Sequence, residues 1–296
     1  MPLPTRDGVG PSCTALPPGP WPTILEFLVE RFPAISRAIW LARMQANEVV
    51  DEHGIQVTEA RRYQSQLRVY YYRSLDDEPV IPFTEIVLYR DDHLLVVDKP
   101  HFLPVTPSGK YLQQTLLVRL KRSLGIDALT PIHRIDRETA GLVMFSVQVA
   151  TRARYTGLFA QRAVTKHYEA IVHWPGQRED FELPAIYRSR LVQDDFFLRT
   201  QEVPGEANSE THLQLLEVRG DSARLRLSPV TGRKHQLRVQ CAALGIPIRN
   251  DRFYPTLLAA VDDDYAHPLQ LLAKSLSFID PLTGEPRSFT SSRSLT

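Results

Sequence analysis

The chain has 296 residues, of which 43% are hydrophobic and 23% charged, and its formal net charge is +1. These values are typical of a soluble globular protein with one large domain or two smaller ones. The low net charge excludes a chain that is basic throughout, so any surface that binds a polyanion must be local. Two cysteines, Cys13 and Cys241, are too few for a disulfide framework or a zinc site. We therefore expect a cytoplasmic protein without a metal.

Neither a membrane span nor a secretory signal is visible in the sequence. No apolar run approaches the roughly 18 residues that cross a bilayer, and the N-terminus lacks a basic stretch followed by an apolar one. Residues 1–20 contain six prolines and three glycines. Such a segment buries little apolar surface, which predicts a disordered or extended tail.

Residues 21–75 predict a small α+β module. Thr23 and Glu26 form a capping-box pattern for a helix that stops before Pro33, and Ser36 can cap a second helix that runs to about Gln45. A hairpin between residues 48 and 58 and a strand at 67–72 follow. The inward candidates of the second helix are Ile35, Ala38, Ile39, Leu41 and Met44.

This order of elements resembles the S-four-type RNA-binding module. Residues 31–73 hold seven arginines and four acidic residues, but the turn at Asp51 and Glu52 is acidic where the module is usually basic. Two interpretations stay open: a module that binds RNA, and a small packing domain that does not. Residues 76–82, rich in acid and proline, predict a linker, and a second domain is expected over 83–296.

The second domain opens with two predicted strands, 86–89 and 94–97, which lead into Asp98-Lys99-Pro100. Leucines at helical spacing then predict a helix that ends at Gly125. Further on, a polar stretch that contains His133, Arg134 and Asp136 runs directly into the apolar segment 142–145. This change predicts a loop that feeds a buried strand. Gly141 at the junction favours a tight bend or a close approach of another backbone.

Two later segments are also distinctive. Lys166-His167-Tyr168-Glu169-Ala170 begins a strand whose alternation places Tyr168, Ala170 and Val172 on one face. Residues 231–238 read Thr-Gly-Arg-Lys-His-Gln-Leu-Arg. The region 219–252 around this octet has eight basic and two acidic residues, and the region 134–166 has six basic and two acidic residues. This excess of positive charge in both regions suits the binding of an RNA phosphate backbone. Residues after 291 are expected to be loose.

These motifs together resemble those of the RluA-type pseudouridine synthases, which isomerise uridine in RNA. The stretch 133–142 departs from the family signature only at Ile135 and Ala140, and the octet at 231–238 matches throughout. Residues 271–281 match in part, since Leu272 replaces a histidine. The resemblance implies an α+β fold with a mixed, mainly antiparallel central sheet and flanking helices.

The resemblance also implies the roles of individual residues. Asp136 is the expected catalytic acid, Arg238 its ionic partner, and Tyr168 a side chain that lies against the target base. Expected substrate contacts comprise Arg134, which takes the space of an extruded nucleotide, Leu237, which packs under the base, and the phosphate-binding or supporting residues Arg233, His235 and Lys166. No cofactor is implied.

Other functions fit less well. A non-catalytic RNA-binding protein is the main alternative, and the intact set of Asp136, Tyr168 and Arg238 argues against it. A nucleoside glycosidase commonly uses paired acids, a nucleobase deaminase needs a zinc set, and the glycine pattern of a Rossmann enzyme is absent. The appended module favours ribosomal over transfer RNA as partner. We expect a monomer.

Overall fold

The computed structural model describes residues 4–73, 77–175, 182–196, 199–259 and 262–296. Its backbone divides into two compact units. The first comprises residues 1–79, 107–113 and 118–127, and the second comprises 80–106, 114–117 and 128–296. In the part of the chain that is described, no helix is both long and apolar enough to cross a membrane.

Residues 4–73 of the first unit form two short helices and a three-stranded sheet. Thr23 Oγ1 accepts the amide of Glu26 at 3.3 Å, and Ser36 Oγ accepts that of Ile39 at 3.3 Å, so both predicted caps are confirmed. The strands lie in the order β1-β3-β2. The elements are β1 (Ser12–Ala15), α1 (Ile24–Arg31), α2 (Arg37–Gln45), β2 (Val49–Asp51) and β3 (Arg68–Tyr71).

The structure corrects three expectations for this unit. Residues 12–15 of the predicted tail are ordered, because β1 pairs with β3 along its whole length. The second arm of the predicted hairpin is only a bridge, Val50 to Gln56, and β2 pairs with β3 instead. On α2, Ile39 is 44% exposed whereas Trp40 is fully buried among aromatic rings. Burial of the larger ring excludes more apolar surface from water.

The acidic turn of this unit has a structural role. The carboxylate of Asp51 is buried, accepts the amides of His53 and Ile55, and forms an ion pair with Arg61. A buried carboxylate needs such donors, and here they close the turn. Of the two acids of this turn, Asp51 is therefore withdrawn from the surface, whereas Glu52 is exposed.

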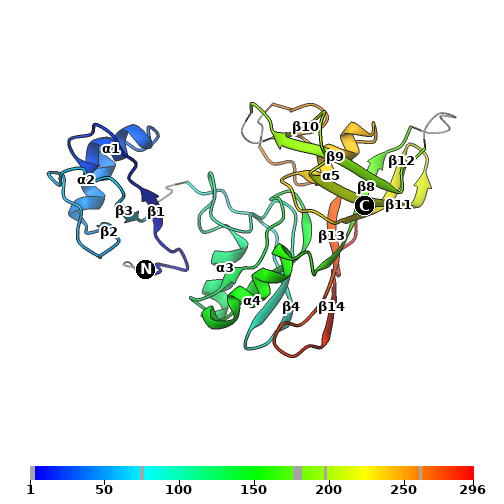
Figure 1. The fold of residues 1–296 in the computed structure, drawn as a ribbon, viewed down its shortest axis with the longest axis horizontal. Helices are drawn as coiled ribbons and strands as arrows, with labels where there is room; N and C mark the ends of the chain where they lie inside the picture. Colours follow the sequence, from blue (N-terminus) through cyan, green and yellow to red (C-terminus); the bar gives the residue numbers. More distant parts are fainter. Residues whose placement is uncertain (1–3, 74–76, 176–181, 197–198, 260–261) are drawn as a thin grey trace. The chain divides into compact units, whose positions relative to one another are not determined.

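An 11-stranded mixed sheet organises the second unit, and Figure 1 labels its strands β4 and β8–β14. The strand order is β10-β9-β11-β12-β8-β13-β7-β5-β4, with β14 beside β13 and β6 beside β7. All neighbours are antiparallel except β13 and β7, which confirms the predicted mainly antiparallel sheet. The strands are β4 (Ile86–Arg90), β5 (Leu94–Lys99), β6 (Thr130–Pro131), β7 (Ala140–Ser146), β8 (Thr165–His173), β9 (Ile186–Gln193), β10 (Thr200–Val203), β11 (Ser209–Arg219), β12 (Ser222–Pro229), β13 (Leu271–Ile279) and β14 (Pro286–Thr290).

Helices cover the middle of this sheet. Helix α4 (Val149–Ala160) packs Tyr155 and Leu158 against β5, β7 and β13, whereas α5 (Gln236–Ala243) packs Leu237 and Cys241 against β8 and β12. Every residue of β5 and β7 is buried, as expected for strands covered on both faces. Helix α3 (Leu116–Leu124), most of whose residues belong to the first unit, ends at Gly125 as predicted.

The end of the chain is fixed, which corrects the expectation of a loose tail. The hydroxyls of Ser291 and Ser292 and the amide of Ser292 donate to the carboxylate of Asp98, at 2.9–3.0 Å. Leu295 is 5% exposed. The fully buried Asp98 requires these donors, and the last residues supply them.

Gly141 lies where the backbones of β7 and β13 meet. Its φ is +110°, and a Cβ built there would be 2.3 Å from the carbonyl oxygen of Ala273. The opposing atom belongs to a strand backbone, which has little freedom to move. The expected close approach is confirmed, and only glycine fits this position.

Substitution of Gly141 by alanine should therefore lower the free energy of unfolding by roughly 2–5 kcal/mol, from backbone strain and overpacking. Denaturant titration measures it. Gly157 in α4 is the matched control, because a Cβ there meets nothing closer than 3.8 Å. Gly157→Ala should raise the free energy of unfolding by up to about 1 kcal/mol, because alanine favours a helix more than glycine does. Equal effects at the two positions would contradict the steric explanation.

Candidate active site

The loop before β7 presents Asp136 and is held on both sides of it. His133 Nε2 accepts the amide of Met144 at 3.1 Å, and its ring stacks on Phe159 with centroids 4.5 Å apart. Burial, with a smaller contribution from Lys166, lowers the pKa of His133 to about 3, so the ring is a neutral acceptor. On the other side of the loop, the backbone amide of Thr139 donates to the backbone carbonyl of Asp136 at 3.2 Å. The carboxylate therefore projects from a fixed turn.

The carboxylate of Asp136 meets two residues of the 231–238 motif. Its Oδ2 is 3.2 Å from Nη1 of Arg238, its Oδ1 is 3.8 Å from Nε2 of His235, and the side chain is 27% exposed. Burial acts to raise the pKa of Asp136, but the neighbouring His235, Arg238 and Lys99 outweigh it and lower the pKa. Arg238 is charged whatever the state of the imidazole. Asp136 is therefore ionised at neutral pH and open to solvent.

Arg238 is itself anchored by a second carboxylate. Its Nε and Nη2 donate to the two oxygens of Asp251 at 2.8 and 2.7 Å, and both side chains are 1% exposed. Glu138 lies 3.8 Å from Nη1. Burial alone would lower the pKa of Arg238, but the bonds to Asp251 raise it. Because Asp251 fixes the guanidinium in a bidentate fork, Nη1 is left to face Asp136.

Tyr168 reaches the same site through the sheet. It lies opposite Ala273 on β13, which lies opposite Gly141 on β7, five residues after Asp136. The ring packs against the hydrophobic cluster that contains Ala170 and Val172, as expected for a shared face, and to which Leu237 of α5 also belongs. Burial, and then the charge of Asp136, raise the pKa of Tyr168, so it keeps its proton at neutral pH.

The other predicted site residues divide into buried and exposed groups. Leu237 is 7% exposed and lines the apolar side with Tyr168. Arg134 is exposed on the Asp136 loop. Arg233 is exposed and donates to the carbonyl of Asn208, and Lys166 lies half-buried, 3.5 Å from the carbonyl of Thr231. The structure thus gathers Asp136, Arg238 and His235 into direct contact, and leaves Arg134 and Arg233 at the surface.

Sequence reasoning missed three charged residues of this site: Lys99, Glu138 and Asp251. Lys99 follows a predicted strand and Asp251 lies in the basic region 219–252, but the sequence indicated no role for either side chain. A buried arginine that pairs with a partly exposed acid needs a second, buried acid to neutralise its charge. Asp251 is that acid for Arg238. Nothing in the linear spacing shows which acid it is.

Lys99 is fully buried below the Asp136 loop. Its Nζ donates to the carbonyls of Pro100 and Arg137, at 2.9 and 3.0 Å. Burial, opposed by the charges of Glu138 and Asp136, lowers its pKa to about 7. Two carbonyl acceptors match the two N–H groups of a neutral amine, and one of them fixes the residue after Asp136.

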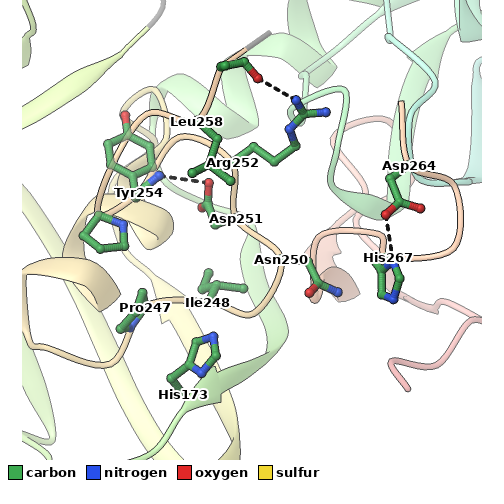
Figure 2. A pocket seen from close by; sticks show the side chains of 12 residues that line it. His173, Pro247, Ile248, Asn250, Asp251, Arg252, Tyr254, Leu258, Asp264 and His267 are labelled. Carbon is green, nitrogen blue, oxygen red and sulfur yellow. Dashed lines mark hydrogen bonds and ion pairs between the residues drawn. The ribbon is translucent and has the colours of Figure 1, made fainter. Parts of the chain in front are cut away.

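A cavity of about 490 Å³ lies next to this site (Figure 2). Its walls include Asp251 and Tyr254, whose backbone amide donates to the Asp251 carboxylate, and Ile248 and Leu258 supply apolar surface. Asp136 does not line it. Within the described ranges no group of three or more His, Cys, Asp or Glu residues could hold a metal ion.

Comparison with known proteins gives a consistent assignment. The sequence profile described as RNA pseudouridylate synthase matches residues 93–243. The "Dual-specificity RNA pseudouridine synthase RluA" of Haemophilus influenzae is 34% identical over 221 residues, which cover 71% of this chain and 94% of that protein. The structure "Human RNA Pseudouridylate Synthase Domain Containing 4" superposes with a TM-score of 0.54 at 26% identity, covering 71% of this chain and 88% of that one.

This chain belongs to the RluA-type RNA pseudouridine synthases. It is an isomerase: the N-glycosidic bond of a uridine in RNA breaks, the uracil turns, and a carbon–carbon bond to the ribose forms. The Saccharomyces cerevisiae "tRNA pseudouridine(32) synthase, mitochondrial" is also similar, with 33% identity over 57% of this chain and 36% of that protein.

The buried lysine of this synthase predicts a pH dependence of stability. In the unfolded chain Lys99 holds its proton up to about pH 10.5, and in the folded chain only up to about pH 7. Between these values the unfolded state binds more protons, so the free energy of unfolding should rise with pH and flatten below about pH 7.

Lys99→Met should remove this part of the slope, as measured by urea unfolding at several pH values across that range. Methionine has a similar volume and no proton to exchange, so the two curves should diverge as the pH rises. Parallel curves for wild type and variant would show that Lys99 keeps its proton in the fold.

Proposed function

We propose that Asp136 is the catalytic carboxylate of the isomerisation, and that its position beside Arg238 is the observation that carries this assignment. The reaction needs a negative group at the junction of sugar and base, either to attack covalently or to take a proton from the sugar. The 3.2 Å contact with Arg238 lowers the pKa of Asp136, and the 27% exposure of its side chain leaves it reachable.

The neighbouring side chains then have distinct roles. Arg238 holds Oδ2 of Asp136 and keeps the acid ionised while the base is bound. Tyr168 and Leu237, which belong to the same hydrophobic cluster, offer an apolar and aromatic surface for an extruded uracil. Arg134, exposed on the same loop as Asp136, occupies the place of that nucleotide in the RNA, and Lys166, Arg233 and His235 were predicted to contact phosphate or support the fold. A resident cofactor has no part in this scheme.

For the RNA substrate, ribosomal RNA is the proposed target, and transfer RNA the alternative. The first unit supports this choice, since it carries exposed arginines such as Arg31, Arg62 and Arg68 and its acidic turn is closed by Arg61. A basic module in the same chain as a catalytic unit suits a large structured RNA. A chain with only two cysteines suits a reducing cytoplasm, and we propose that the protein acts there as a monomer.

Asp136→Asn tests the catalytic assignment. Product formation should fall by on the order of a thousandfold or more, because the amide is a poor nucleophile and a poor base. RNA affinity should be retained, since Arg238 keeps Asp251 as its partner. Release of the C5 hydrogen from labelled uridine in RNA measures the reaction.

Asp221→Asn is the control for that experiment: the same chemical change at a side chain that is 82% exposed, expected to have no effect. Full activity of the Asp136 variant would refute the role of Asp136 and leave membership of the family untouched.

The RNA target can be found by mapping pseudouridine across total cellular RNA with and without the gene. We expect at least one position of ribosomal RNA to revert to uridine, and to be restored by the wild-type gene but not by the Asp136→Asn gene. Loss confined to transfer RNA would favour the alternative substrate.

A further inference from the structure

The hydroxyl of Tyr254 lies between a backbone amide and the imidazole of His235. The amide of Thr200 donates to Tyr254 Oη at 2.8 Å, and Oη is 2.9 Å from Nδ1 of His235. Tyr254 is 4% exposed, and burial raises its pKa, so the hydroxyl keeps its proton. Because the amide can only donate, the hydroxyl proton is directed to Nδ1.

This direction selects one tautomer of His235. Burial, partly opposed by Asp136, lowers the pKa of His235, so the ring is neutral at neutral pH. A neutral imidazole whose Nδ1 accepts a hydrogen bond carries its proton on Nε2. That nitrogen faces Oδ1 of Asp136 at 3.8 Å, longer than a hydrogen bond. Such contacts often tighten only when substrate is bound.

The backbone holds the imidazole in this place. His235 has a φ of +55°, in the left-handed region that non-glycine residues rarely adopt, directly before α5. The side chain of Gln236 ties the preceding turn by accepting the amide of Arg233 and the hydroxyl of Thr231, and by donating to the carbonyl of Glu210. Strain of this kind persists only where the surrounding bonds enforce it.

We propose that Tyr254 and His235 are positioning residues of the isomerisation: the tyrosine hydroxyl fixes the imidazole tautomer, and Nε2–H steadies Oδ1 of Asp136 while Arg238 steadies Oδ2. With both oxygens held, the carboxylate cannot rotate away from the ribose. This inference rests on the proposed role of Asp136. It gives His235, which was predicted to contact phosphate or to support the fold, a role beside the catalytic acid.

Several charged groups face His235 and act on its titration. Asp136 and Glu138 approach from the loop before β7, Arg238 from α5 and Lys234 from the same turn, and the uncharged Tyr254 comes from the segment after α5. Among these, only the hydroxyl of Tyr254 bonds Nδ1. Its removal therefore changes the tautomer without adding or removing a charge.

Tyr254→Phe in the full-length chain is the test. At pH values where His235 is neutral, its proton can then occupy either nitrogen, and the single-turnover rate on RNA should fall about tenfold, as for lost supports of ligand histidines. As the pH falls below the pKa of His235, both nitrogens carry protons, so the deficit relative to wild type should shrink. RNA affinity should not change.

Tyr187→Phe is the matched control, because its hydroxyl bonds Glu202 at 2.8 Å in the same sheet and is remote in sequence from His235. It should leave the rate and its pH profile unchanged. A deficit in Tyr254→Phe that is equal at every pH, or equal to that of the control, would assign Tyr254 a role in folding only and overturn the inference.

Nitrogen NMR of the wild-type chain tests the tautomer independently of any variant. The resonances of His235, assigned by comparison with His235→Gln, should show a proton on Nε2. A proton on Nδ1 would overturn the inference. Neither result bears on Asp136→Asn, whose activity alone decides the catalytic assignment.

Discussion

Arg238 is buried beside three carboxylates, and the arrangement of the site depends on how it divides its donors among them. Asp251 is as buried as Arg238 and takes two donors in a fixed fork, whereas the partly exposed Asp136 takes one. Removing one member of such a buried pair typically costs about 3–5 kcal/mol, since the other charge is left without a partner. The Arg238–Asp251 pair therefore stabilises the fold, and the remaining donor of Arg238, Nη1, binds the catalytic acid Asp136.

The sheet decides which residues share this site. The parallel join of β7 and β13 places Gly141 against Ala273, and the antiparallel join of β13 and β8 places Ala273 against Tyr168. A residue with a Cβ at position 141 would collide with the β13 backbone and disturb this alignment. The glycine at the end of the Asp136 loop thus brings an acid and an aromatic ring together across three strands.

Prediction from sequence succeeded where the signal was local. Caps at Thr23 and Ser36, the close approach at Gly141 and the shared face of Tyr168, Ala170 and Val172 follow from residue type and period. It failed where burial is decided by distant partners. Ile39 was expected inside and Trp40 lies there, and the residues after Ser291 are held by Asp98, which is 193 positions away from Ser291.

The sequence alone determined the chemistry that is present: a loop with one acid, an octet rich in donors and a strand with a tyrosine, which together indicated the family. Only the tertiary structure decided the partners. Asp251 lies 13 positions from Arg238, Tyr254 lies 19 positions from His235, and Lys99 lies 38 positions from Arg137, whose carbonyl it binds. Hydrogen bonds and ion pairs act over a few ångströms in space, and residue spacing along the chain does not encode which distant groups come within that range.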